Sequence, residues 1–256
     1  MNEAEITNLR NQQARICVVH YSCENLGDSN QGLSPRITSI AVLDFSSKMM
    51  HSFSIHLIAE IKGVSRDQIP SNYDDLEREM LLAFDKFISE KSNAIWLHWN
   101  MSNINFGFEA IEHRFKVLTK QEAKKIADSN RKNLSSLIVG KYGDNCVDHP
   151  RMENLMKLNG GVSRDFLSGE AEVAAFSNKE YLKLHKSTMS KVYWFTHMIE
   201  LLMAGKVKTQ RSNLKERFLS SLESPVAKVI GLIASVVAVV QLICFLYSWV
   251  VSKISG

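Results

Sequence analysis

An uninterrupted apolar run near the C-terminus places the strongest limit on how this chain can fold. Residues 229–251 (VIGLIASVVAVVQLICFLYSWVV) contain no charged side chain, and Lys228 and Lys253 bracket them. A helix rises about 1.5 Å per residue, so about 20 apolar residues cross the roughly 30 Å of bilayer hydrocarbon. The run therefore predicts one C-terminal transmembrane helix with a short tail over 252–256, rather than a buried core helix.

Basic residues beside the predicted span indicate its orientation. The segment 205–228 holds six lysine and arginine residues against two glutamates, whereas the tail holds only Lys253. Basic residues stay on the cytoplasmic side of a membrane, and the polar N-terminus has no apolar signal core. We therefore expect a single-pass protein of the cell inner (plasma) membrane with its N-terminal domain in the cytoplasm. The basic juxtamembrane segment also predicts contact with membrane lipid headgroups.

One polar side chain lies near the middle of the predicted span. Gln241 is the thirteenth residue of 229–251. Hydrogen bonds between helices in a bilayer average about 0.6 kcal/mol and reach about 1–2 kcal/mol. Gln241 is therefore a candidate for transmembrane association into a homo-oligomer, the alternative being a residue that the span merely tolerates.

The remainder of the chain has the composition of a globular protein. Hydrophobic residues make up 45% of the sequence and charged residues 23%, which excludes a disordered chain. The net charge of +4 does not by itself indicate a nucleic-acid partner. Cys17, Cys23, Cys146 and Cys244 form no CxxC pair, which favours reduced thiols over a disulfide framework or a zinc site.

The order of apolar patterns predicts an α/β domain. Three β-rich segments come first, at 15–21, 36–45 and 48–58, after a polar N-terminal arm or helix at 1–14. The second and third are expected to form a hairpin, which makes the first three strands antiparallel. A helix from residue 72, a strand at 94–98 and a helix at 106–118 follow, and the remaining expected helices are 133–141, 151–158, 169–176, 179–185 and 188–203.

This order resembles the ribonuclease H-like fold, and in particular the DEDD family of 3′-to-5′ exonucleases, over residues 15–204. The segment VVHYSCENL lies where that family has Asp-x-Glu on its first strand, and AIWLHWNMSNINFGFEAIEHRF lies where it has its third motif. The segment HKSTMSK lies where it has His-x4-Asp. The resemblance implies a mixed sheet flanked by helices. In the family four carboxylates hold two Mg²⁺ ions and the histidine acts as general base.

Departures from this pattern remove the expected catalytic groups. His20 and Ser22 stand at the first two carboxylate positions, Asn103 at the third and Ser190 at the fourth, whereas His185 matches the family histidine. Neutral serine and asparagine do not replace carboxylates as ligands of Mg²⁺. The resemblance therefore implies a catalytically inactive pseudo-exonuclease with no metal and no cofactor.

A domain of this kind is expected to bind a nucleic-acid end without cleaving it. Aromatic rings stack on bases, and basic or hydrogen-bonding side chains contact phosphate. The alternatives are that the aromatic residues pack the core and that the basic cluster is a solvated helix face. The contact candidates are His98, Trp99, Asn103, Arg131, Lys132 and His185.

Sensing domains joined to a membrane segment are typical of membrane-disrupting effectors in bacterial anti-phage systems such as retrons. By this analogy we expect a nucleic-acid or nucleoprotein partner, for example a reverse transcriptase with its DNA/RNA product. One alternative is a membrane adaptor that binds protein only. The other is an active nuclease with non-standard ligands, drawn from Glu24, Asp28, Asp144, Asp148 and His185, or from a relocated metal site of Asp144, Asp148 and His149.

Overall fold

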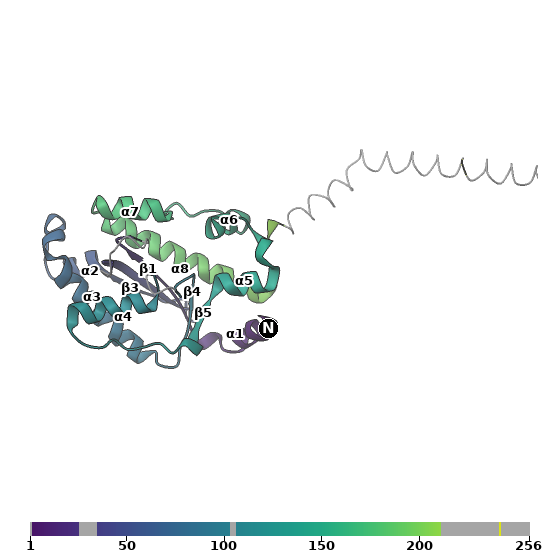
Figure 1. The fold of residues 1–256 in the computed structure, drawn as a ribbon, viewed down its shortest axis with the longest axis horizontal. Coiled ribbons are helices and arrows are strands. Elements are labelled where there is room, and N and C mark those ends of the chain that lie inside the picture. The colour runs from purple at the N-terminus through teal and green to yellow at the C-terminus, as the bar shows by residue number, and fades with distance from the viewer. Residues whose placement is uncertain (1, 26–34, 103–105, 211–240, 242–256) are drawn as a thin grey trace, which may run out of the picture. The chain divides into compact units, whose positions relative to one another are not determined.

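The structure is a computed structural model that describes residues 2–25, 35–102, 106–210 and 241 (Figure 1). The chain divides into two compact units, Met1–Val207 and Lys208–Gly256. All helices and strands described below belong to the first unit.

A five-stranded mixed sheet forms the centre of the domain, in the order β3-β2-β1-β4-β5. β1 (Ile16–Cys23) pairs antiparallel with β2 (Ile37–Asp44), which pairs antiparallel with β3 (Met50–Ser54). β4 (Ile95–His98) joins the other edge of β1 in parallel, followed by β5 (Arg131–Asn133). The predicted α/β class, with an antiparallel first trio of strands and flanking helices, is confirmed.

The central strand β1 is buried along its whole length, as expected for a strand covered on both faces. Side chains alternate between the two faces of the sheet. Val19 and Tyr21 join one apolar core, whereas Ile16 and Val18 join the other. The continuous apolar character of β1 therefore reflects two cores rather than one.

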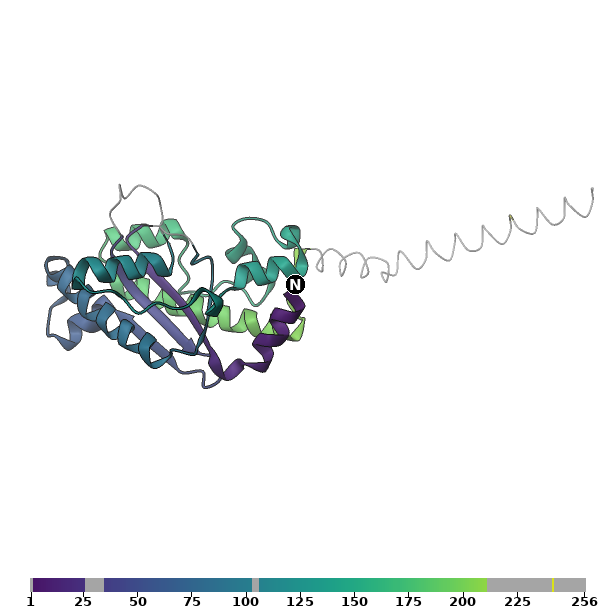
Figure 2. The same ribbon diagram turned by 60° about the horizontal axis from the view of Figure 1, so that its bottom comes forward.

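One core lies between the sheet and helices α2 (Ile55–Ile61), α3 (Tyr73–Glu90), α4 (Phe108–Thr119) and α7 (Gly169–Ser177). Among these helices, the amphipathic helix α3 contributes the most buried residues to this core, mainly at spacings of three and four. Figures 1 and 2 show α3 and α4 side by side over this face of the sheet. The α3 residues in the core are Tyr73, Leu76, Met80, Leu81, Phe84 and Phe87.

The long helix α8 (Tyr181–Ala204) crosses the opposite face of β1 and β2, and α5 (Leu134–Tyr142) and α6 (Arg151–Leu158) complete this second core. Of the two expectations for residues 1–14, an arm or a helix, the structure shows a helix, α1 (Asn2–Asn11), and this helix packs on the domain. Its Ile6 and Leu9 are buried in the second core. The domain therefore begins before residue 15, because two apolar side chains three positions apart suffice to dock a short helix.

Three boundaries differ from the sequence expectation. The third strand ends at Ser54 rather than at residue 58, because Ile55 and Ala59 lie on one helical face and both enter the first core. The helices expected at 179–185 and 188–203 form the single helix α8. The strand β5 was not predicted, since three polar, half-buried residues give no apolar pattern.

The short 3-10 helices are η1 (Gln13–Arg15), η3 (Arg66–Gln68), η4 (Pro70–Asn72), η5 (Asp128–Asn130) and η6 (Asp144–Cys146).

Within the described residues, no helix has the length and apolar character needed to cross a membrane. The predicted span 229–251 lies outside the described residues, apart from Gln241, which is helical and exposed. The tail, most of the basic segment 205–228, Asn103 and Asp28 also lie outside them.

Candidate functional site

Two serines on neighbouring strands begin the polar layer between the sheet and α8. Ser22 of β1 lies directly opposite Ser39 of β2. The Ser22 Oγ is 2.5 Å from Thr188 Oγ1, and the Ser39 Oγ is 2.6 Å from His185 Nδ1. The predicted positions Ser22 and His185 are therefore brought into one buried polar cluster, defined here as Ser22, Ser39, Glu172, His185, Ser187, Thr188 and Lys191.

Glu172 is the hub of the buried polar cluster, and sequence reasoning missed it. Its Oε1 accepts hydrogen bonds from Ser22 Oγ at 3.2 Å and from Ser187 Oγ at 3.0 Å. Lys191 Nζ lies 2.8 Å from the same oxygen, and the two side chains are only 5% and 6% exposed. Glu172 lies on α7, outside the three segments that resemble the family motifs, so no local pattern marks it. The cluster thus contains a paired, desolvated cation beside β1.

His20, at the other expected carboxylate position of β1, is a neutral packing residue. Its ring meets Phe195 edge-on at 5.4 Å and Phe106 at 6.2 Å. Burial lowers the pKa of His20 well below its ordinary value, and the nearby Lys191 and His98 lower it further. His20 therefore contributes neither a ligand charge nor a proton at neutral pH.

The two predicted positions on α8 do not act together. Burial, with a smaller contribution from His56, lowers the pKa of His185 to about 4. Ser190 is half-buried, and its Oγ has no hydrogen-bond partner in the part of the chain that the structure describes. Residues five apart differ by about 140° around a helix, whereas residues three apart share a face. Thr188 therefore accompanies His185 and Ser190 does not, whereas Lys191 belongs to the cluster through its ion pair with Glu172.

The aromatic contact candidates are core residues. His98 is 2% exposed, and its Nδ1 accepts a hydrogen bond from the Met101 amide at 3.1 Å. Trp99 is 5% exposed and stacks on Phe195, with ring centroids 5.8 Å apart. Burial, together with Arg131, lowers the pKa of His98 to about 4. Neither ring offers a face to a base, so the core alternative holds for Trp99.

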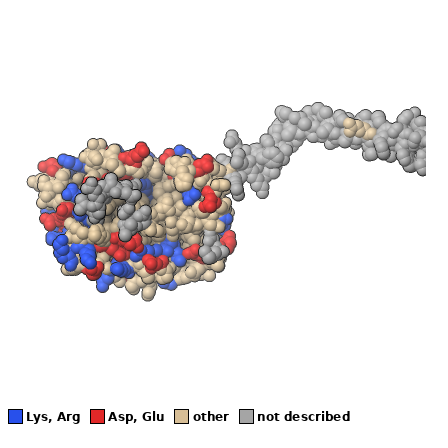
Figure 3. All heavy atoms as spheres, in the orientation of Figure 1, with Lys and Arg blue, Asp and Glu red and all other residues tan. Residues whose placement is uncertain are grey.

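The basic contact candidates are already paired. The Arg131 guanidinium bonds the carboxylate of Glu109 and lies 3.0 Å from Glu112. Lys132 Nζ lies 3.0 Å from a carboxylate oxygen of Glu5. These acidic partners lie on α4 and α1, outside the run 130–133. The run therefore appears more basic in the sequence than the surface that it forms in the fold. Figure 3 shows basic and acidic side chains interspersed on the face in view.

Alternative metal ligands do not assemble either. Across the described ranges, no three His, Cys, Asp or Glu side chains lie close enough to hold a metal ion. Asp144 and Asp148 lie at η6 and just after it, and His149 follows. The described residues thus give no support to the relocated site.

A second polar network lies at the sheet end of α3. Arg114 on α4 donates to both oxygens of Glu77, at 2.9 and 2.6 Å, and the Ile37 amide donates to the same carboxylate at 2.7 Å. The Glu77 side chain is 0% exposed. This network joins α3, α4 and β2 and has a structural role.

A third cluster surrounds Asp44 at the opposite end of β2. Its carboxylate accepts hydrogen bonds from the Cys17 thiol at 3.4 Å, from His51 Nε2 at 3.1 Å and from Lys91 Nζ at 3.1 Å. The arrangement has the residue types of a thiol catalytic site. However, burial and the Asp44 carboxylate raise the pKa of Cys17 to about 12, so the thiol is not a nucleophile at neutral pH.

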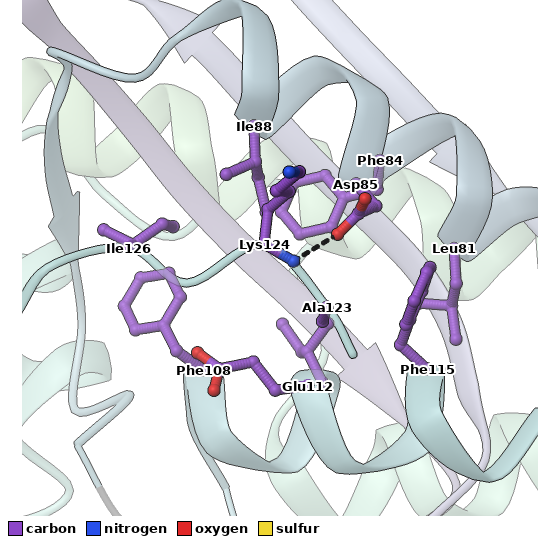
Figure 4. A pocket seen from close by; sticks show the side chains of 11 residues that line it. Leu81, Phe84, Asp85, Ile88, Phe108, Glu112, Phe115, Ala123, Lys124 and Ile126 are labelled. Atoms are coloured by element: carbon purple, nitrogen blue, oxygen red, sulfur yellow. Dashed lines mark hydrogen bonds between the residues drawn. The ribbon is translucent and has the colours of Figure 1, made fainter. Parts of the chain in front are cut away.

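A small apolar crevice between α3 and α4 is a packing gap rather than a site. Figure 4 shows Phe84, Phe108 and Phe115 converging on it, while Lys124 closes one side through a hydrogen bond from its amide to Asp85 at 2.6 Å. Its volume of about 20 Å³ suits about one water molecule. Its walls are almost entirely apolar, so it has no groups to orient a ligand.

No family model, no curated protein and no solved structure matches the chain. Function therefore has to be inferred from the side-chain geometry described above.

Proposed function

We propose that the chain is a membrane-anchored, catalytically inactive exonuclease-like domain of ribonuclease H-like fold. The observation that carries the proposal is the ion pair of Lys191 with Glu172 beside Ser22. The resemblance implies metal-binding carboxylates at this place on β1. The protein instead has Ser22 there, with the ammonium group of Lys191 close by. The buried ammonium group of Lys191, bound to the Glu172 carboxylate, gives this position a positive charge, so a Mg²⁺ ion would meet repulsion instead of free ligands.

The strand arrangement supports the same fold assignment. An antiparallel trio comes first, then helix α3, then β4 in parallel beside β1. The last helix, α8, returns His185 to the sheet next to Ser39. This sequence of elements agrees with the order that the resemblance implies.

The biological role that we propose follows from the domain arrangement. The domain recognises a nucleic acid or nucleoprotein partner, and the predicted helix at 229–251 acts on the membrane as an effector in anti-phage defence. Association through Gln241 would assemble the active form. Charge pairing at Arg131 and Lys132 means that recognition uses another surface of the domain.

Nuclease assays of the purified full-length protein in detergent test the proposal. We expect no digestion of end-labelled single strands or duplexes with Mg²⁺ or Mn²⁺, while an electrophoretic shift reports binding. Metal-dependent digestion that Glu24→Ala abolishes would overturn it and favour the active-nuclease alternative. Absence of any shift, with capture of a protein partner, would favour the adaptor alternative.

A further inference from the structure

An open cleft lies where α2 and η3 meet the start of α8. Its volume is about 610 Å³, within the roughly 300–1,000 Å³ typical of small-molecule sites. Its apolar lining comes from Ala59, Val64, Ile69, Tyr181 and Leu182. The cleft is therefore large enough for an organic ligand and offers its body an apolar surface.

The rim of the cleft carries more free basic than free acidic groups. Arg66, Lys179 and Lys186 line it and form no ion pair with another described residue. A fourth basic residue, Lys183, is neutralised by Glu180 at 2.9 Å. Of the remaining acidic lining residues, Asp165 lies 4.0 Å from Arg164, and Glu60 forms no ion pair with a described lysine or arginine, although its charge acts on His56.

Three unpaired cations around one hollow favour an anionic ligand. A guanidinium and two ammonium groups match a phosphate monoester, because arginine bonds two of its oxygens and lysine adds point charges. This surface differs from the neutralised pairs at Arg131 and Lys132, where each cation already has its carboxylate.

A histidine joins this cleft to the buried polar cluster. His56 lines the cleft, and its ring centroid lies 5.1 Å from that of His185. The His56 Nδ1 is 2.9 Å from Ser54 Oγ, which leaves Nε2 for a ligand. His185 is in turn bonded to Ser39, so His56 lies between the cleft and the buried polar cluster.

We propose that this cleft binds the phosphate monoester of a nucleotide, either free or at the end of a nucleic-acid strand. Arg66, Lys179, Lys186 and His56 contact the phosphate, and the apolar lining with Tyr181 contacts the base or sugar. The proposal rests on the proposed function, since it names the ligand class that an inactive exonuclease-like domain retains. It also explains how recognition proceeds although the candidates on β4 and β5 are buried or paired.

Binding measurements on the full-length protein in detergent test the cleft. The small probes are AMP, adenosine and inorganic phosphate. The strand probes are oligonucleotides of one sequence with a 5′-phosphate, a 3′-phosphate or hydroxyl groups at both ends. We expect AMP to bind at least tenfold more tightly than adenosine or phosphate, and a phosphorylated strand to bind more tightly than the unphosphorylated strand if strand ends are the natural ligand.

The decisive variant is Arg66→Gln with Lys186→Gln. The matched control is Arg78→Gln with Lys86→Gln, which removes the same charges from α3 outside the cleft. All four residues are exposed or half-exposed, so circular dichroism and thermal unfolding should be unchanged. We expect the cleft variant to weaken AMP binding at least tenfold and the control to change it less than twofold.

The outcomes separate the cleft from the wider proposal. Strand binding that the cleft variant leaves intact refutes the cleft and leaves the proposed function standing. AMP binding at the cleft without strand binding supports the cleft with a free nucleotide as ligand, and refutes nucleic-acid recognition. Equal affinity for phosphate and AMP refutes the nucleotide assignment, and no binding of any probe refutes both proposals.

Discussion

Lys191 Nζ lies 2.8 Å from Glu172 Oε1 in a site where both side chains are almost fully buried. The pair links α8 to α7, and each charge depends on the other because both have lost most of their water. Glu172 also accepts a hydrogen bond from Ser22, so the region beside β1 is filled and closed, in contrast to an active metal site, which must admit ions and substrate.

Replacing one member of this pair is expected to destabilise the domain strongly. Glu172→Gln leaves a buried ammonium without its counter-charge, which should lower the free energy of unfolding by about 3–5 kcal/mol. The double variant Glu172→Gln with Lys191→Met removes both charges and should recover most of that loss. Urea unfolding of the three proteins measures the difference. A double variant no more stable than the single one would show that packing, not charge pairing, holds this site.

The ion pair of Arg114 with Glu77 should contribute as much to the free energy of unfolding as the pair of Lys191 with Glu172. Arg114→Met leaves the Glu77 carboxylate, 0% exposed, without its bidentate partner, and should cost about 3–5 kcal/mol of unfolding free energy. Arg78→Met, at the neighbouring position of Glu77 on α3, removes only exposed ion pairs and should cost less than about 1 kcal/mol. Equal effects of the two changes in urea unfolding would contradict a structural role for the Arg114 network.

Acidification should destabilise the domain between pH 6.5 and about 4. Burial lowers the pKa of His98 and of His185 from 6.5 to about 4, so in this window the unfolded chain binds protons that the folded domain does not. At about 1.4 kcal/mol per pKa unit, each histidine should remove about 2–3 kcal/mol by pH 4.5. Urea unfolding at pH 7 and 4.5 measures the loss. His185→Asn should reduce the loss of unfolding free energy between the two pH values by the contribution of one histidine. An unchanged loss would show that His185 does not contribute to it.

The predicted membrane helix gives a separate test. Gln241→Leu keeps the span apolar, so membrane insertion should be normal, while oligomers held by interhelical amide bonds of about 1–2 kcal/mol each should weaken. Crosslinked oligomer and membrane depolarisation are measured together at equal protein levels. Unchanged depolarisation would remove Gln241 from the mechanism, and survival of toxicity after replacement of 229–251 by polyleucine would reject the effector role of the helix.

Local sequence patterns predicted most of the fold. The amphipathic spacing that begins at residue 72 and the apolar run at 94–98 identified the start of α3 and the bounds of β4 to within one residue, because each pattern reflects burial in the core. The errors fall where long-range contacts decide the outcome. β5 exists because the parallel edge of β4 pairs with three polar residues, and α1 is packed because α5 and α8 receive Ile6 and Leu9.

The site was less predictable than the fold. Ser22 and His185 were identified through the family resemblance, and the structure places them in the same buried polar cluster. Glu172 and Lys191 were missed, because the partner of each charge lies on another helix. The sequence predicts Arg131 and Lys132 as contact residues because a run of basic residues does not show the acidic residues that neutralise it in space.

The position of α8 at the end of the domain has a consequence for synthesis. β1 and β2 are synthesised early, but their second face, including His20 and Ser22, is covered by α8, which comes last in the domain. A nascent chain that ends before residue 204 thus exposes an apolar half-core that favours aggregation. At about 5–20 residues per second, residue 229 follows residue 204 within about 1–5 seconds. The ribosome therefore synthesises the last core helix and the predicted membrane segment within seconds of each other.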